Sequence, residues 1–477
     1  MAWHRPAVAA SQWEGTNALV NPSEEVDYSH CLSADGDGLA VEICHYERNF
    51  LAGRRLPGDL PAPGLPANFS ENLIWGTDLG YSVRVGDATL YFFGDSIPKS
   101  RWISGRLWVG GSLLGVPYTY DFNGDGTLDW VEASADLDGG LQYVSVTEQA
   151  AFDASGEATG LLTEFEQNRI FVDGAPRGLE LGYSVPTGVI QVDEETIYYW
   201  YGKYLNNPRC DQSHLLAMDV ASGEWRHLSL FAEKKFIQAA PVLVERDRLP
   251  PANDACGIPW TKSGERGLLI YGSGMDLDND LDGGSAESWA ACSLDFSLDY
   301  RESSLYLAYL SLDDLESPQS AARIYYYTGD PSECWARGAI DEAKPIIAEP
   351  VFGEFSVQPV PGTDYLILSY SADRSFNVRA ARLDHPWIWT DPDRSPQQGY
   401  GDLLVAGSLR MMDSLRLGQT VTLEKALFFK RAVSTWGGSV ADPLMLRYGV
   451  YLYSSFLDFG RLVRGLADLD AAGFETS

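Results

Sequence analysis

Residues 76–96 read Gly-Thr-Asp-Leu-Gly-Tyr-Ser-Val-Arg-Val-Gly-Asp-Ala-Thr-Leu-Tyr-Phe-Phe-Gly-Asp-Ser. Two runs rich in β-branched and aromatic residues, 81–85 and 89–93, flank the dipeptide Gly86-Asp87. A two-residue connection with glycine first is typical of a type II′ turn between antiparallel strands. The stretch therefore predicts a β-hairpin in which Val85 faces Ala88.

Two aspartates stand at the open end of this hairpin. When Val85 faces Ala88, the numbers of facing residues sum to 173, and Asp78 and Asp95 satisfy the same sum. Their Cβ atoms should then lie about 5 Å apart on one face. Such proximity raises the pKa of one carboxyl above that of the other, which suits glycoside hydrolysis with retention of configuration. The alternative is that both side chains cap strand ends and bind turn amides.

Internal repetition indicates the architecture. The pentapeptide Leu-Gly-Tyr-Ser-Val at 79–83 recurs at 181–185, and Gly-Glu-Phe-Ser-Val at 353–357 opens a third similar unit that turns at Pro361-Gly362. Each copy precedes a hairpin, and convincing amphipathic helices are scarce apart from 459–472. The chain is predicted to be all-β, and radially repeated sheets favour a β-propeller. A β-sandwich followed by a second β-domain is the alternative.

Short strand-like runs recur along the chain, with turn residues between them. Besides the hairpin, they are 189–192, 196–201, 268–271, 305–310, 323–327, 365–370 and 447–453. Matching positions of the inner strands of a propeller converge on its axis. Glu354 is therefore expected to share a pocket with Asp78 and Asp95, the alternative being a solvated strand end. We predict an irregular N-terminal arm (1–72), a propeller domain (73–455) and a C-terminal tail (456–477).

Charge and composition exclude several partners. The formal net charge of −32 disfavours nucleic acid and anionic membrane surfaces. No apolar stretch reaches the length of about 18 residues that spans a bilayer.

Six cysteines without C-x-x-C spacing indicate up to three disulfides in an oxidising compartment, with buried thiols as the alternative. No signal peptide is visible, so the sequence is either a trimmed mature chain or cytoplasmic. We expect a secreted or cell-surface monomer without an organic cofactor.

Residues 121–132 match the calcium-loop pattern D-x-[DN]-x-[DN]-G-x5-E in full. Oxygen ligands at alternating positions suit a hard cation, and Gly126 permits the sharp turn. Because the flanks are not clearly helical, we predict a structural Ca²⁺ loop and not a sensor. The predicted ligands are Asp121, Asn123, Asp125, Thr127, Asp129 and Glu132.

Three further stretches carry weaker signals. The acidic loop 276–284 has no clean metal pattern and is expected to be solvated. The aromatic runs 198–201 and 325–327 could supply sugar-stacking platforms, although alternate members must lie in the core. Gly94-Asp95-Ser96-Ile97 with Asp211-Gln212-Ser213-His214 resembles an esterase motif set, but that family is α/β, so a chance match is favoured.

An ordered set of motifs from about residue 72 to 455 resembles glycoside hydrolase family 183, the endo-D-arabinanases, formerly a bacterial domain of unknown function. The set comprises the 76–96 stretch, Val185-Pro186-Thr187-Gly188, residues 353–358, Asn377-Val378-Arg379-Ala380 and Tyr448-Gly449-Val450-Tyr451. The N-terminal arm, the calcium loop and the 276–284 loop look like insertions. Val189 also stands where the family usually has glycine after Pro-Thr-Gly.

The resemblance implies a five-bladed propeller that cleaves internal α-D-arabinofuranosyl bonds, as in mycobacterial arabinogalactan or lipoarabinomannan. It places the catalytic carboxylates at Asp78 and Asp95, supported by Thr77, Thr187, Glu354 and Arg379. The alternatives are a non-catalytic carbohydrate-binding propeller, another furanosidase or arabinanase specificity, or a calcium-dependent adhesion module.

Overall fold

The structure is a computed structural model of the 477-residue chain. The residues that it describes are 28–33, 38–53, 74–76, 79–85, 88–93, 97–98, 102–103, 106–107, 119–120, 127–136, 140–145, 150–152, 158–159, 183–204, 212–220, 225–249, 256–258, 265–274, 302–317, 320–372, 374–417, 421–437 and 447–471.

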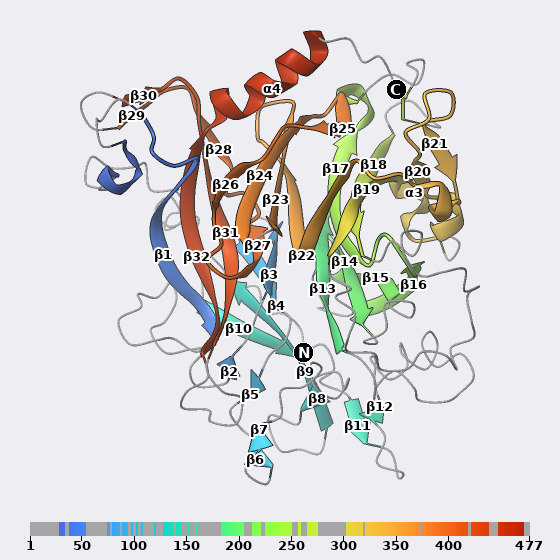
Figure 1. Ribbon diagram of the computed structural model, residues 1–477. Coiled ribbons are helices and arrows are strands. Elements are labelled where there is room, and N and C mark those ends of the chain that lie inside the picture. Colours follow the sequence, from blue (N-terminus) through green and yellow to red (C-terminus); the bar gives the residue numbers. More distant parts are fainter. Residues whose placement is uncertain are drawn as a thin grey trace.

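Antiparallel strands form a propeller-like arrangement of four blades (Figure 1). The second and third blades are joined into one sheet by the pairs Glu302↔Phe352 and Ser303↔Val351. The first blade contains β13 (Tyr183–Gln191), β14 (Thr196–Tyr204), β15 (Gln212–Asp219) and β16 (Trp225–Ala232). The second contains β17 (Gln238–Glu245), β18 (Arg266–Ser273), β19 (Glu302–Ser311), β20 (Tyr325–Tyr327) and β21 (Trp335–Arg337). The third contains β22 (Ile347–Pro359), β23 (Tyr365–Ala372), β24 (Ser375–Arg382), β25 (His385–Trp389) and β26 (Asp393–Pro396). The fourth contains β27 (Tyr400–Leu404), β28 (Arg410–Met412), β31 (Ala426–Gly437), β32 (Arg447–Asp458) and β1 (Ile43–Gly53).

Shorter elements complete the described part of the chain. They are β2 (Ile74–Gly76), β3 (Leu79–Val85), β4 (Ala88–Phe93), β5 (Ile97–Pro98), β6 (Trp102–Ile103), β7 (Arg106–Leu107), β8 (Thr119–Tyr120), β9 (Thr127–Asp136), β10 (Gly140–Ser145), β11 (Ala150–Phe152), β12 (Ala158–Thr159), β29 (Leu415–Leu417), β30 (Val421–Leu423), α3 (Leu312–Leu315), α4 (Phe459–Ala471) and the 3₁₀ turns η2 (Ser29–Cys31), η4 (Arg246–Arg248), η6 (Ser320–Arg323) and η7 (Ile340–Glu342).

The first strands of the blades contact one another in a closed cycle that also includes β3. Contacts run from β3 to β13, β17, β22, β27 and back to β3. The β3–β4 hairpin therefore stands between the fourth blade and the first, and β4 also contacts β9.

The core lies between neighbouring blades. Leu268 and Ile270 of β18 pack toward the first blade, whereas Leu269 and Tyr271 pack toward the third. Because adjacent residues of a strand point to opposite faces, a strand buried on both sides needs an uninterrupted apolar run. Residues 268–271, Leu-Leu-Ile-Tyr, are such a run, and all four are 0% exposed.

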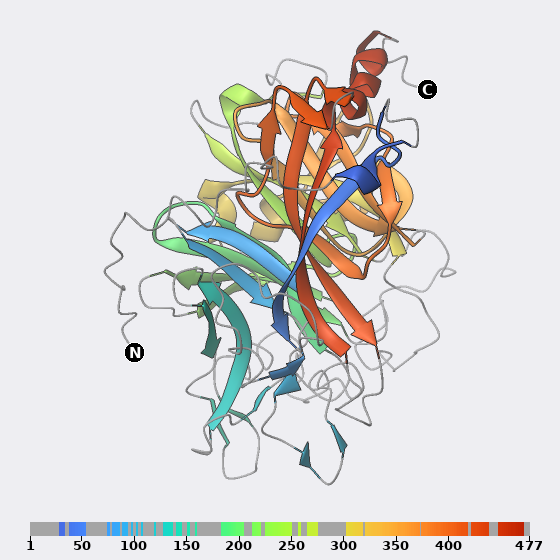
Figure 2. The ribbon, with the colours of Figure 1, turned by 90° about the vertical axis from the view of Figure 1, so that its left-hand side faces the viewer.

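The N-terminal strand β1 completes the fourth blade. It pairs antiparallel with β32 from Ile43↔Leu457 to Gly53↔Gly449, and Figure 2 shows it in blue along that edge. The expectation of an irregular arm over residues 1–72 is therefore wrong for Ile43–Gly53. This strand joins the two ends of the chain in one sheet, while the predicted domain boundaries stay predictions.

Most strand predictions are confirmed. The expected runs lie in or overlap observed strands, except that Arg323 ends the 3₁₀ turn η6. The turn at Pro361-Gly362 joins β22 to β23, with Gly362 at φ +74°. The expected helix at 459–472 is α4, which buries Phe459, Leu462 and Leu466 and contacts β24 and β31. None of the described helices is long and apolar enough to cross a membrane.

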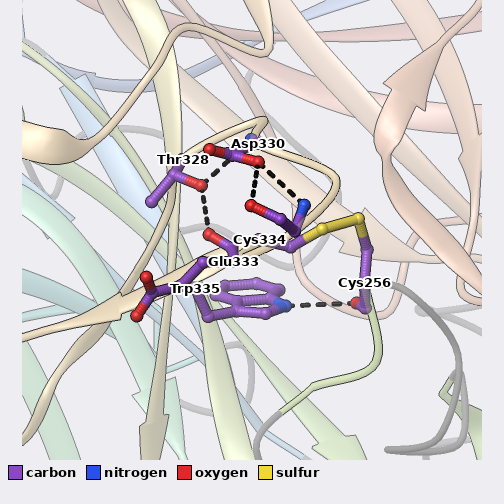
Figure 3. Close-up of a disulfide and its surroundings, with 7 residues drawn as sticks. Cys256, Thr328, Asp330, Glu333, Cys334 and Trp335 are labelled. Atoms are coloured by element: carbon purple, nitrogen blue, oxygen red, sulfur yellow. Dashed lines mark hydrogen bonds between the residues drawn. A yellow bond between two sulfur atoms is a disulfide. The ribbon is translucent and has the colours of Figure 1, made fainter. Parts of the chain in front are cut away.

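Two disulfides are present among the described residues. Cys31–Cys44 joins η2 to β1, and Cys256–Cys334 joins the β17–β18 connection to the residue before β21. Figure 3 shows Trp335 beside the second bridge, with its Nε1 donating to the carbonyl oxygen of Cys256 at 3.1 Å. Cys210 and Cys292 lie outside the described residues. Each bridge therefore ties a segment outside the strands to a neighbouring sheet.

A fully buried ion pair joins β27 to β31. Asp402 and Arg431 are each 0% exposed, and Ser371 Oγ donates to Asp402 Oδ2 at 2.6 Å. The Arg431 guanidinium also lies 3.9 Å from the ring centroid of Phe376. Burial raises the pKa of Asp402 above its ordinary value, whereas Arg431 and the Ser371 hydroxyl oppose the rise.

His45 of β1 completes this buried network. Its Nδ1 lies 2.7 Å from Ser455 Oγ, and its Nε2 lies 2.9 Å from Ser395 Oγ and 3.4 Å from a guanidinium nitrogen of Arg431. Burial, then the charge of Arg431 and then that of His30 lower the pKa of His45 to about 3. The imidazole is therefore neutral in the folded protein.

The neutral state of His45 predicts a loss of stability in acid. The unfolded chain takes up a proton near the usual pKa of 6.5, whereas the folded chain resists it down to a pKa of about 3. This contribution is fully present above pH 6.5 and declines as the pH falls toward 3, by about 1.4 kcal/mol per pH unit. Urea unfolding of the wild type and His45→Gln over this range measures it. Identical pH slopes for the two proteins would contradict the prediction.

Candidate active site

The structure describes paired residues on both sides of the predicted catalytic segments. The β3–β4 ladder ends at Leu79↔Phe93. Beyond it, β2 and β5 pair antiparallel at Gly76↔Ile97. The chain thus connects Gly76 to Leu79 through two residues and Phe93 to Ile97 through three.

Those short connections contain the predicted catalytic residues. Thr77 and Asp78 form the first, and Asp95 is the middle residue of the second. All three lie outside the described residues, so their roles stay predictions. In sequence, Asp78 directly precedes the paired residue Leu79, and Asp95 is two residues from the paired residues Phe93 and Ile97.

A bulge changes the register at the open end of the hairpin. The numbers of facing residues sum to 173, as predicted, in the five pairs nearest the turn. Leu79 then faces Phe93, one position out of step, with Gly80 as the extra residue. Leu79 has φ 62° and Gly80 φ 114°, the left-handed region that glycine tolerates and leucine rarely adopts. Direct opposition of Asp78 and Asp95, and with it the preference for retention, no longer follows from the register.

Contacts join β27 to β3 on one side and to β22 on the other. An ideal Cβ at Gly401 would lie 3.8 Å from Leu79 Cδ2, which brings the start of β27 beside the start of β3. On the other side of β27, the N–H of Leu404 donates to Ser356 Oγ of β22 at 2.7 Å. Two residues before these contacts stand Glu354 on β22 and Asp402 on β27. Asp402 thus lies on the strand that borders the start of β3, and Glu354 lies on the next strand of the ring, β22.

Glu354 lies in a bulge of the inner strand, where β22 shifts register between Phe352 and Phe355. Its side chain is half-buried, and no ion pair or hydrogen bond involves it within the described part of the chain. Bulges often redirect a side chain beside an active site. The ligand-binding role of Glu354 therefore stays a prediction.

Asp402, a second acid on an inner strand, was not predicted from the sequence. Gly401-Asp402 lies at a register shift of β27, as Gly353-Glu354 does on β22, so the repeated Gly-acid dipeptide was the available signal. The two acids differ in surroundings, because Asp402 is fully buried against Arg431. Asp402 shapes the strand and is not exposed to a ligand.

A polar cluster lies where β3, β13 and β17 meet. The Tyr81 hydroxyl lies 3.4 Å from Oε1 of Gln238, although β13 stands between their strands in the ring. Gly188 is required here, because a Cβ would lie 1.9 Å from the carbonyl oxygen of Ala239. Thr187, the bulged residue of β13, is 1% exposed, and its Oγ1 has no hydrogen-bond partner among the described residues.

Arg379 is engaged within its own blade. Its Nε donates to the Tyr370 hydroxyl at 2.8 Å, Nη1 to the Thr390 carbonyl at 2.6 Å and Nη2 to Glu349 Oε2 at 2.6 Å. It lies on β24 and reaches Glu349 of β22, and no hydrogen bond or ion pair joins it to Glu354 among the described residues.

The remaining predicted sites have mixed outcomes. Ser213 and His214 of the esterase-like motif are buried inside β15 at 0% exposure. Residues 198–200 are buried too and offer no stacking platform, whereas Tyr327 is half-buried and stacks on Trp387 with ring centroids 5.2 Å apart. The loop 276–284 lies outside the described residues.

Only the second half of the calcium motif is described, and only as backbone. Asp121, Asn123 and Asp125 lie outside the described residues, whereas Thr127, Asp129 and Glu132 belong to β9. Tyr120 of β8 pairs with Asp129, so strands and not helices border the motif. The predicted ligand set therefore stays a prediction.

No protein-family model and no curated protein matches the sequence. Among solved structures, the GH43_1 enzyme of Xanthomonas citri with xylotriose is 11% identical, with a TM-score of 0.35 over 82% of this chain and 89% of that one. An α-L-arabinanase of Penicillium chrysogenum with arabinobiose is 10% identical (TM-score 0.33; 80% and 94%). An α-L-arabinofuranosidase of Fusarium graminearum with an iminosugar inhibitor is 9% identical (TM-score 0.34; 88% and 99%). At these TM-scores the likenesses decide neither the fold nor the chemistry of this chain.

The hydroxyl of Thr187, for which the described residues supply no hydrogen-bond partner, gives a test of the polar cluster where β3, β13 and β17 meet. Thr187→Val keeps the shape and removes this buried hydroxyl, so the free energy of unfolding should stay equal or rise by about 1 kcal/mol. As a control, Ser369→Ala removes a hydroxyl that donates to the Asp402 carbonyl at 2.8 Å, and it should cost about 1–3 kcal/mol. Thermal and urea unfolding measure both. Destabilisation of Thr187→Val equal to that of Ser369→Ala would show that the hydroxyl already has a structural partner.

Proposed function

We propose that this chain is a secreted, monomeric, endo-acting glycoside hydrolase of the family 183 type. It cleaves internal α-D-arabinofuranosyl linkages of arabinan with the carboxyl groups of Asp78 and Asp95. One observation carries the proposal: in the chain, the short segments that contain these residues lie between the β2–β5 pair and the β3–β4 ladder. Two disulfides support an oxidising compartment.

In this mechanism the two aspartates have different protonation states. One protonates the departing glycosidic oxygen, and the other attacks or stabilises the oxocarbenium-like carbon. Glu354, which has no partner among the described residues, binds a sugar hydroxyl or adjusts the pKa of the pair. Asp402 adds little repulsion at the site, because the guanidinium of Arg431 compensates its charge.

We also propose a fifth blade built on the β3–β4 hairpin. The closed cycle of contacts through β3, β13, β17, β22 and β27 supports it, as does the contact between β4 and β9. A groove across the centre of such a ring would admit an internal segment of a polysaccharide, which is what endo-cleavage requires.

The catalytic assignment predicts that Asp78→Asn and Asp95→Asn each abolish release of reducing ends from mycobacterial arabinogalactan. Amides have nearly the same shape as carboxyls but neither donate a proton nor attack, so the melting temperature should hardly change. The matched control is Asp87→Asn, at the predicted closed end of the same hairpin, which should keep wild-type activity. Products are resolved by size within a panel of polysaccharides.

Activity in either variant at the wild-type level would refute the assignment. Retention of arabinan on a column of wild-type protein without new reducing ends would favour the carbohydrate-binding alternative. Cleavage of a different furanoside in the panel would keep the carboxylate pair and change only the substrate.

We further propose that residues 121–132 bind a structural Ca²⁺. The donor set is all oxygen, as this cation prefers, and the β8–β9 pairing closes the loop at its base. Removal of the ion with EGTA should lower the melting temperature, and added Ca²⁺ should restore it, because the ion binds only the folded loop. Asp121→Ala should melt at the chelated temperature with or without Ca²⁺. A melting temperature insensitive to EGTA would contradict this.

A further inference from the structure

A distant serine holds the backbone beside the predicted catalytic residue. The N–H of Leu79 donates to Oγ of Ser434, 355 positions away in the sequence, with an N···O distance of 2.7 Å. Leu79 is 1% exposed and Ser434 is 0% exposed, so water does not compete for this bond. The bond therefore restrains the Leu79 amide, and Asp78 is the residue joined to that amide in the sequence.

The bond stabilises a conformation that local preferences oppose. Leu79 has φ 62° beside the Gly80 bulge, where the regular ladder is interrupted. Gly401 of β27 lies beside both residues, since a Cβ there would lie 3.5 Å from Ser434 Oγ and 3.8 Å from Leu79 Cδ2, and its φ of 85° favours glycine at this position. Without the serine hydroxyl, the buried N–H would lack a partner, at a cost of about 1–3 kcal/mol. Relaxation of Leu79 toward ordinary backbone angles would relieve that cost.

Two other contacts hold β3 further along. Ser82 Oγ accepts the N–H of Ala406 at 2.8 Å, from the segment after β27. On the opposite side, the Tyr81 hydroxyl lies 3.4 Å from Gln238 Oε1. The strand is therefore held from both sides of the ring, and the Ser434 contact is the one at the end that leads into Asp78.

We infer that Ser434 is a positioning residue for the carboxyl of Asp78. The inference rests on the proposed function and adds a residue from the fourth blade to it. Ser434 touches no substrate; it acts through the Leu79 amide. Catalysis is sensitive to such placement, because a displacement of about 1 Å can cost on the order of a hundredfold in rate.

The test compares three variants with the wild type. Ser434→Ala removes the acceptor, Ser434→Thr keeps a hydroxyl, and Ser408→Ala is the matched control. Ser408 Oγ accepts the N–H of Lys430 at 3.0 Å on the same strand β31, and within the described part of the chain its hydroxyl makes no hydrogen bond to β3. Values of kcat, KM and melting temperature are measured on arabinan, at a temperature well below the melting point of the least stable variant.

We expect Ser434→Ala to lower kcat by about tenfold or more with KM within about twofold, and Ser434→Thr to restore most of kcat. Ser408→Ala should lose comparable thermal stability and keep its kcat. Equal kcat in Ser434→Ala and Ser408→Ala, or no recovery in a folded Ser434→Thr, would overturn the inference and leave the proposed function intact. A wild type that cleaves no furanoside polysaccharide would overturn the proposed function instead.

Discussion

The seams of the ring contain backbone N–H groups that no β-ladder pairs, and serine hydroxyls accept them. Ser434 receives the amide of Leu79, Ser356 that of Leu404, and Ser82 that of Ala406. A buried N–H without a partner costs about 1–3 kcal/mol, so three such groups would weigh heavily against the marginal stability of a folded chain. Serine suits this task because its hydroxyl is short enough to fit between closely packed strands and can accept while it donates elsewhere. Ser356 and Ser369 show this, since their hydroxyls lie 2.9 Å apart and Ser369 donates to the Asp402 carbonyl.

The second constraint is the buried charge at the junction of the third and fourth blades. Arg431 would be an uncompensated buried cation without Asp402, and removal of one partner from such a pair usually costs about 3–5 kcal/mol. Residues of five strands form this network. Asp402 and Arg431 belong to β27 and β31, and Ser371, Phe376 and His45 contact them from β23, β24 and β1. Because His45 arrives on the N-terminal strand, the polar network and the closure of the fourth blade depend on each other. The same junction borders the start of β3, because β27, which carries Asp402, contacts that strand.

Local signals predicted the elements whose geometry is set by neighbours in sequence. The Gly86-Asp87 turn gave the register of five pairs, and Pro361-Gly362 gave another hairpin. The bulge at Gly80 was not predictable in this way, because the contact that stabilises it comes from Ser434. The strand Ile43–Gly53 was missed for a similar reason: its partner β32 is about four hundred residues away, and its own alternation is interrupted by two register shifts. Glu354 was singled out from the sequence by its position at the start of a predicted hairpin. For Asp402 the only available signal was the Gly-acid dipeptide.

By itself, the sequence determined the all-β class, the main hairpins and the register of β3 with β4 near their turn, because apolar alternation and turn chemistry act over a few residues. Only the tertiary structure decided which polar residues are already engaged: Arg379 with Glu349, Tyr370 and Thr390, Asp402 with Arg431, and Ser434 with Leu79. It also separated Glu354 from Asp402, which look alike in sequence: Asp402 is fully buried against Arg431, whereas Glu354 is half-buried. The physical reason is that desolvation and partner distance depend on segments brought together by the closed ring, and no local pattern records them.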